Sequence, residues 1–175
     1  MSPTGDIREK VRERASFRCE FCCVTETDAG GELTIDHFRP VSRGGDDSSG
    51  NLIYCCVRCN QYKLDYWPES DGGTMLWNPR LENSDCHFLE LDDGRLYPLS
   101  ETGSLTLRRL RLNRPPLVAA RLRRRRDTDK VRLLRQYQNL TETLEQLLSQ
   151  QAELMREQQR LLKKQHKLIK LLLGI

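Results

Sequence analysis

Two short cysteine pairs, Cys19-Glu-Phe-Cys22 and Cys56-Val-Arg-Cys59, are the stretches of this sequence that decide its fold. They are separated by 33 residues. Two thiolates at this spacing can hold one metal ion from a tight turn, and two such pairs complete a tetrahedral zinc site. A site with four thiolates leaves no open position for substrate, so we expect a structural zinc that replaces the core so small a module cannot build. Buried free cysteines are the alternative interpretation.

The segment that joins the two pairs contains residues suited to a second kind of chemistry. Asp36 and His37 are adjacent, Asn51 follows in the same segment, and Asn60 comes directly after the last cysteine. Carboxylate and amide oxygens are hard ligands that suit Mg²⁺ or Mn²⁺ rather than zinc. A histidine without a thiol neighbour suits general-base work near neutral pH. Alternation along a regular strand would place Asp36 and His37 on opposite faces, so joint catalysis requires the strand to end or twist there.

These residues together resemble the HNH endonuclease family over about residues 8–66. The resemblance rests on the following run: Cys19-x-x-Cys22, Ile35-Asp36-His37-Phe38-Arg39-Pro40, Gly44-Gly45, Asn51-Leu52, Cys56-x-x-Cys59-Asn60 and Lys63. It implies an α+β fold class, in which a ββα-metal domain holds one divalent cation between two strands and a helix. Three later segments resemble an extension of some bacterial HNH proteins: Trp77-Asn-Pro-Arg80, Cys86-His-Phe88 and Leu110-Arg-Leu-Asn-Arg-Pro115.

The resemblance also implies a role for each residue of the motif. His37 would be the general base that activates water, and Asp36 and Asn60 would be ligands of catalytic Mg²⁺ or Mn²⁺. Asn51 would fix the loop and orient His37. The motif ends on asparagine here rather than histidine, which keeps an oxygen ligand.

Several basic residues near this motif are candidates for contact with nucleic-acid phosphates. Arg39, Arg43 and Lys63 flank the proposed centre, and solvated surface charge is the alternative interpretation of each. The sequence does not distinguish DNA from RNA.

Length and composition exclude several classes of protein. The chain has 175 residues, of which 37% are hydrophobic and 31% charged, with a net charge of +4. This length allows one domain of ordinary size, or one small domain with an extension. The chain lacks the ~20 consecutive apolar residues that a spanning helix needs. The N-terminus lacks the apolar region of a secretory signal.

The seven cysteines are an odd number with no sign of secretion. We therefore expect an intracellular, cytoplasmic thiol protein rather than a disulfide framework. Cys23 and Cys55 adjoin the two pairs and leave the register of the metal ligands open.

The charge is strongly segregated along the chain. Residues 1–104 carry 11 Lys or Arg against 19 Asp or Glu, whereas residues 105–126 carry nine arginines and no acidic residue. Nine like charges repel one another, which favours a surface for a polyanion over an ordinary solvated helix. Arg123, Arg124, Arg125 and Arg126 are the candidate nucleic-acid contacts in this block. Docking onto an acidic protein surface is the alternative.

From Pro115 onward the pattern is that of one long helix, because no further proline or glycine occurs before Gly174. Leu133, Leu140, Leu147, Leu154, Leu161, Leu168 and Ile175 recur at intervals of seven. The alternate positions are Tyr137, Leu144, Gln151, Gln158, Gln165 and Leu172. This spacing is typical of a coiled coil. A helix over 128–173 would be about 69 Å long, so we expect a homo-oligomer or a helical partner protein. A lone helix that folds back onto the nuclease domain is the alternative. A second apolar stripe favours a trimer, tetramer or bundle over a dimer.

Shorter patterns predict the remaining elements and three regions. Residues 6–18 favour an amphipathic helix, 33–37 and 51–55 favour strands, and 56–65 favour the start of a helix. Residues 76–107 favour small strands or irregular structure around turn signals such as Thr102-Gly103. We therefore expect a nuclease core at 1–75, an extension at 76–114, and a basic segment with a long helix at 115–175.

The sequence thus favours a metal-dependent DNA endonuclease that contains structural Zn²⁺. A non-catalytic zinc module that binds nucleic acid is the alternative from a different class. A third hypothesis is an effector nuclease held silent in a bacterial antiviral defence complex by its coiled coil.

Overall fold

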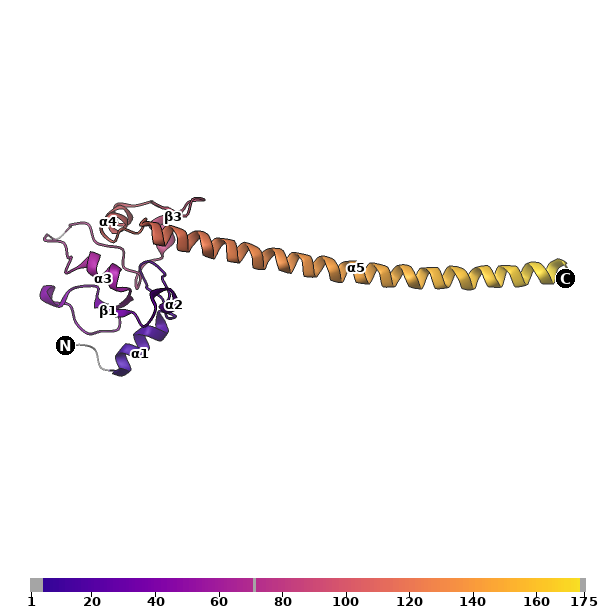
Figure 1. Cartoon of the computed structure of the whole chain (residues 1–175), viewed down its shortest axis with the longest axis horizontal. Helices are drawn as coiled ribbons and strands as arrows, with labels where there is room; N and C mark the ends of the chain where they lie inside the picture. Colours follow the sequence, from indigo (N-terminus) through magenta and orange to yellow (C-terminus); the bar gives the residue numbers. More distant parts are fainter. Residues whose placement is uncertain (1–4, 71, 174–175) are drawn as a thin grey trace. The chain divides into compact units, whose positions relative to one another are not determined.

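The computed structural model describes residues 5–70 and 72–173 (Figure 1). It combines helices with two small antiparallel sheets, β1–β2 and β3–β4. The predicted α+β fold class with a long C-terminal helix is therefore confirmed. Within the described residues, no helix is long and apolar enough to cross a membrane.

The part of the fold that positions the candidate site is a strand–strand–helix unit. Strand β1 (Thr34–His37) pairs antiparallel with β2 (Leu52–Cys55), so that Asp36 lies opposite Ile53 and His37 opposite Leu52. Helix α3 (Val57–Lys63) follows β2 almost at once and contacts β1. Strand β2 is buried along its whole length, which explains why its sequence is a continuous apolar run.

Helix α1 (Gly5–Arg14) contacts β2 and buries Val11, as expected for a short amphipathic helix. It ends four residues before the predicted end, because the backbone turns at Ser16 and Phe17, which have positive φ. A short helix that the sequence pattern did not predict, α2 (Glu26–Ala29), follows the first cysteine pair. Thr25 and Asp28 form a capping box at its start, which satisfies backbone groups that would otherwise lack partners.

Residues 76–109 contain two short strands and a helix. After the 3₁₀ turn η2 (Ser84–Cys86), β3 (Phe88–Glu90) pairs with β4 (Leu96–Pro98). The expectation of strands or irregular structure was wrong for α4 (Glu101–Arg109), which begins at the N-cap Ser100. Gly103 lies inside this helix rather than in a turn. A Cβ atom there would lie 2.3 Å from the backbone oxygen of His87, so the glycine permits close packing of α4 on the chain before β3.

The chain forms two compact units, divided after Arg124. The first unit has one core, to which Val11, Leu52 and the later residues Trp77, Leu110 and Leu117 all belong. The expected boundaries after residues 75 and 114 therefore do not divide the contacts, because residues 76–117 pack into the same core as the cysteine pairs.

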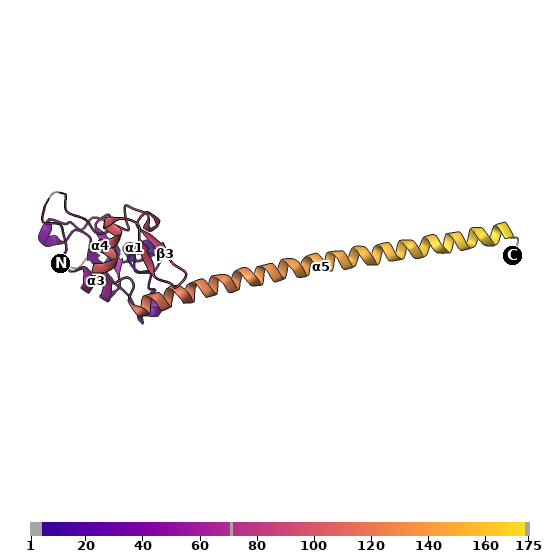
Figure 2. The same ribbon diagram turned by 90° about the horizontal axis from the view of Figure 1, so that it is seen from above.

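Helix α5 (Pro115–Leu173) begins in the first unit and forms the second, where it is unbroken in both views (Figures 1 and 2). Its leucines at intervals of seven, from Leu133 to Leu168, are between 50% and 61% exposed. Ile175 lies outside the described residues. The apolar row is thus open to solvent in a single chain.

Candidate metal and catalytic centre

Four cysteines from the two pairs converge on one point in the core. The Sγ atoms of Cys19, Cys22, Cys56 and Cys59 all lie within 4.8 Å of one another, and all four side chains are buried. The first pair sits in a tight turn, in which the Cys23 amide donates to the Cys19 carbonyl. The second pair begins α3, where the Cys56 Sγ accepts a hydrogen bond from the Cys59 amide. This arrangement fits the tetrahedral four-thiolate set that zinc prefers.

The cluster also resolves which adjacent cysteines are not ligands. Cys23 is exposed, whereas Cys55 is buried on β2 with its thiol 3.7 Å from Thr34 Oγ1. Burial, together with the nearby Asp36 carboxylate, raises the pKa of the Cys55 thiol far above its usual range, so this thiol stays neutral.

Asp36 lies at the centre of a buried charge pair with Lys63. The Asp36 Oδ2 atom is 2.9 Å from the Lys63 ammonium. The same ammonium donates to the backbone carbonyl of His37 at 2.6 Å, and the Lys63 side chain is fully buried. Lys63 therefore ties α3 to the end of β1. The expectation that it contacts phosphate at the surface is not met by this arrangement, because the ammonium points into the protein.

His37 is the last residue of β1 and faces a different partner from Asp36. Its Nε2 atom lies 2.6 Å from Oδ1 of Asp47 in the loop between the two strands, and the ring is 17% exposed. No hydrogen bond or ion pair joins the Asp36 and His37 side chains, in agreement with the alternation expected along a strand. A carboxylate in this position can fix the orientation of an imidazole and stabilise its protonated form.

The loop that carries Asp47 is held by Asn51. The Asn51 side chain accepts from the Arg39 amide at 2.7 Å and donates to the carbonyls of Arg39 and Asp46 at 3.1 and 2.8 Å. Gly45 allows this closure, because a Cβ there would lie 1.8 Å from the Arg39 carbonyl oxygen. Both ends of the loop are therefore pinned, and the loop places Asp47 on the His37 ring.

The residues implied as ligands of a catalytic cation fit a hard metal ion. Among the described residues, Asp36 Oδ2 is buried without a hydrogen-bond partner, although the Lys63 charge lies near it. Asn60 stands one turn before Lys63 on α3, on the same side of the helix as the residue that reaches Asp36. Carboxylate and amide oxygens, the groups that Asp36 and Asn60 carry, are the ligands that Mg²⁺ or Mn²⁺ prefers.

The other basic candidates lie in two places. The Arg39 guanidinium stacks 5.2 Å from the ring centre of Trp67. Arg43 lines a hollow of about 420 Å³ together with Tyr66 and Arg109, and the acidic Asp65 and Glu69 also line it. Residues 123–126 are exposed at the end of the first unit and the start of the second.

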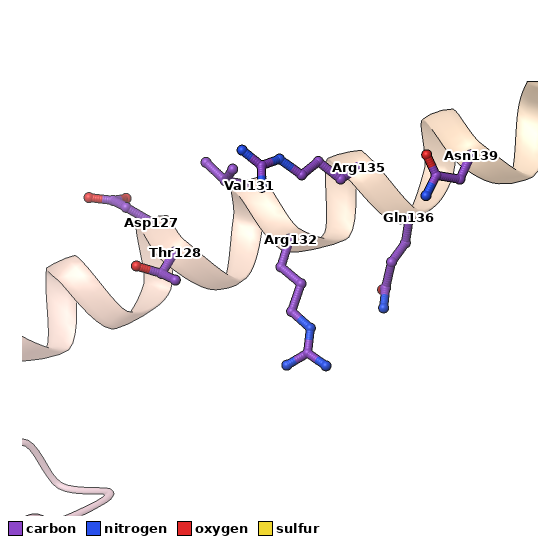
Figure 3. A pocket seen from close by; sticks show the side chains of 7 residues that line it. All are labelled: Asp127, Thr128, Val131, Arg132, Arg135, Gln136 and Asn139. Atoms are coloured by element: carbon purple, nitrogen blue, oxygen red, sulfur yellow. The ribbon is translucent and has the colours of Figure 1, made fainter.

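A shallow hollow of about 610 Å³ follows one stretch of α5 (Figure 3). It is lined by Asp127, Thr128, Val131, Arg132, Arg135, Gln136 and Asn139. These side chains project from successive turns of one helix, and none of the metal-site or general-base candidates is among them. It is therefore a helix surface rather than a reaction site.

Sequence reasoning missed two structural features of this centre. The pattern contained a signal for Asp47, since an acidic pair stands between Gly45 and Asn51 in the loop. The inward role of Lys63 had no such signal, because it depends on how α3 packs against β1.

Comparison with known proteins identifies the region that contains this centre. Residues 19–70 match the family model described as HNH endonuclease, which confirms the resemblance over that part of the chain. No curated protein and no solved structure matches the chain. The match covers all four clustered cysteines, the β1–β2–α3 unit and the loop that carries Asp47.

Proposed function

From this family match and the geometry of the centre, we propose that the protein is a metal-dependent endonuclease that hydrolyses DNA phosphodiester bonds. The observation that carries the proposal is the juxtaposition at the end of β1. There His37 is held by a loop carboxylate, while the carboxylate of the adjacent Asp36 pairs with Lys63 of α3. The candidate base and the candidate metal ligand are thus neighbours in the chain, and their side chains contact different partners.

In the proposed reaction His37 takes a proton from water, which then attacks phosphorus in line. Asp47 positions the imidazole and stabilises the charge that it gains. Mg²⁺ or Mn²⁺ held by Asp36 and Asn60 would stabilise negative charge on the phosphoryl group and on the leaving 3′ oxygen. Lys63 holds the Asp36 carboxylate and the His37 backbone in place, which fixes the distance between the base and the metal ligand.

Binding of the substrate rests on exposed arginines rather than on Lys63. Arg39 and Arg43 are exposed in the loop between β1 and β2, and Arg123, Arg124, Arg125 and Arg126 are exposed on α5. Guanidinium groups bind phosphates in bidentate fashion and carry no sequence information when they do so. We propose that these residues position DNA without selecting its sequence.

The second unit supports assembly with further copies of the chain. An exposed leucine row of this length is a large apolar stripe, which water disfavours and a partner helix would cover. Gln151, Gln158 and Gln165 interrupt the alternate row at consecutive heptads. A second copy aligned in parallel and in register would place glutamine opposite glutamine, where each amide can donate and accept.

A non-catalytic zinc module is the second candidate function. The buried cysteine cluster and the arginine surface support it equally well, because neither requires chemistry. Dependence of plasmid cleavage on a divalent cation separates the two functions. We expect the full-length protein to nick supercoiled plasmid with Mg²⁺ or Mn²⁺ and to lose this activity in EDTA, with its zinc content unchanged by brief exposure to the chelator. DNA binding without cleavage under all of these ions would favour the module, and RNA in the same assay tests the alternative substrate.

A silent effector within a larger complex shares this chemistry and differs in regulation. It predicts little cleavage by the isolated protein and cleavage after a helical partner is added or removed. The size of the purified particle, measured alone and with a co-purifying protein, distinguishes it from an active homo-oligomer.

A further inference from the structure

A single arginine from outside the matched segment reaches the cysteine cluster. The Nη2 atom of Arg114 lies 3.9 Å from the Sγ of Cys22 and 3.8 Å from those of Cys56 and Cys59. These contacts span more than 50 residues of sequence, and nothing in the local pattern around Arg114 predicts them. The guanidinium therefore faces three of the four sulfurs at once.

Burial and hydrogen bonds hold the chain on both sides of Arg114, so this contact is part of the fold. Leu110 and Leu112 are fully buried, and the Asn113 side chain is bonded to both the amide and the carbonyl of Leu96. The second terminal nitrogen of Arg114, Nη1, donates to the Leu110 carbonyl at 3.0 Å and to that of Arg111 at 3.3 Å. The guanidinium is thus locked between backbone oxygens on one side and sulfur atoms on the other.

The net charge of the metal-loaded cluster gives a physical reason for this contact. Four thiolates around a divalent zinc ion carry a net charge of 2−, and a buried net charge is costly unless it is paired. Among the described residues, no carboxylate forms an ion pair with Arg114. Its guanidinium is therefore available to the sulfurs, and hydrogen bonds from a charged donor are the strong ones.

We propose that Arg114 belongs to the metal centre as a positioning residue. It donates to the zinc-bound thiolates, offsets part of their charge, and links metal binding to the seating of the first turn of α5. Arg114 directly precedes Pro115, where α5 begins, and its carbonyl accepts from the amides of Leu117 and Val118. The same residue therefore contacts the sulfurs and starts the helix. The proposal concerns the zinc site alone and does not depend on the nuclease reaction.

Metal affinity of the full-length protein tests this role. Residues that hydrogen-bond to the ligands of a metal ion typically contribute ~10–100-fold to metal affinity. We expect Arg114→Gln to weaken zinc binding by about that factor in competition with a chromogenic chelator. Arg111→Gln is the matched control, because Arg111 stacks 4.8 Å from the Tyr62 ring and is a neighbouring arginine without a sulfur contact. It should retain zinc as the wild type does.

Cobalt substitution provides a readout that a merely structural role would not change. A hydrogen bond to a thiolate stabilises the sulfur lone pair, so its loss should shift the thiolate-to-Co²⁺ charge-transfer bands of Arg114→Gln to lower energy. Arg114→Lys keeps the positive charge but loses the planar guanidinium with its two terminal nitrogens. We therefore expect a zinc affinity and a band position between those of wild type and Arg114→Gln. The proposal is overturned if Arg114→Gln keeps the wild-type bands and a zinc affinity within threefold of wild type. It is also overturned if Arg111→Gln loses as much affinity, since that marks general destabilisation.

Discussion

At the scale of single residues, buried charge sets the geometry of the candidate site. Lys63 has no exposed surface, forms an ion pair with the Asp36 carboxylate and donates a hydrogen bond to the His37 carbonyl. A buried ammonium is tolerated only with such partners, and a buried carboxylate likewise needs a compensating charge. The residue was predicted to contact phosphate because sequence shows its charge and not its direction. Its position in the interior makes it the link between β1 and α3.

Loss of Lys63 should therefore weaken the fold. In Lys63→Met the buried Oδ2 atom of Asp36 loses its partner, and breaking a buried pair costs about 3–5 kcal/mol. Urea unfolding of zinc-loaded protein measures the change, with Lys130→Met on α5 as the exposed control. We expect Mn²⁺ to restore part of the lost stability, since a cation at Asp36 supplies the missing charge. A loss below about 1 kcal/mol, the range of surface pairs, would contradict the assigned role.

Glu26 offers a test of the electrostatics around the first cysteine pair. It accepts from Arg12 Nε and Nη2 at 2.6 and 2.8 Å and from the hydroxyl of Tyr54. The hydrogen bond from Arg12, followed by that from Tyr54, lowers the pKa of Glu26 to about 2. An unfolded chain has a glutamate pKa of about 4.3, so the ionised form is favoured by folding.

The stability that Glu26 provides should be complete above the unfolded pKa and should disappear as the pH falls towards 2. We expect Glu26→Gln to be less stable than wild type at pH 6, and the difference to shrink as the pH falls through the unfolded pKa of about 4.3. The two proteins are compared at each pH at which both keep their zinc and unfold cooperatively. A difference in unfolding free energy that stays constant over that range would show that Glu26 has an ordinary pKa.

At the scale of elements, the strands and helices that depend on local sequence patterns could be predicted. Strands β1 and β2 and helix α3 were predicted to within a few residues, because strand alternation, turn residues and cysteine spacing are local. Helix α4 was missed because a glycine such as Gly103 is typical of a turn. In the structure, glycine is needed at this position because the helix packs closely against the backbone of His87. The Asp36–Lys63 pair and the Arg114–sulfur contacts were also beyond prediction, since both depend on packing between distant segments.

The zinc cluster should be the element on which the first unit depends for folding. Metal binding at a structural site is part of the folding free energy, so Cys59→Ser should abolish cooperative unfolding and tight zinc binding. Cys86→Ser is the matched control, since Cys86 is exposed and lies outside the cluster. Elemental analysis should give about one zinc per wild-type chain. A folded wild-type preparation without zinc would contradict this prediction.

At the scale of the whole molecule, we propose a different role for each of the two units. The first contains the cysteine cluster and the candidate reaction site, and the second presents an apolar row along α5. Parallel assembly through this row would gather several nuclease units at the same end of a coil. Two nicks on opposite strands could then become a double-strand break.

Cysteine cross-linking tests the orientation of this assembly in the full chain. In a background of Cys23→Ser and Cys86→Ser, we expect Gln151→Cys and Gln165→Cys each to form disulfide dimers readily. Gln159→Cys, on the other side of the helix, should not. An antiparallel pair can bring at most one of the first two positions opposite itself. Monomers in light scattering with no cross-linking at either position would show that the row does not bind a second copy.

The central claim is that this centre hydrolyses DNA with His37 as its base, and one rate ratio tests it most directly. The measurement is the first-order rate of plasmid nicking by wild type and by His37→Ala in Mn²⁺, at equal zinc content and equal DNA binding. Loss of a general base typically costs ~10²–10⁴ in rate, and we expect a decrease in that range. Cleavage by His37→Ala within about tenfold of wild type would contradict the account.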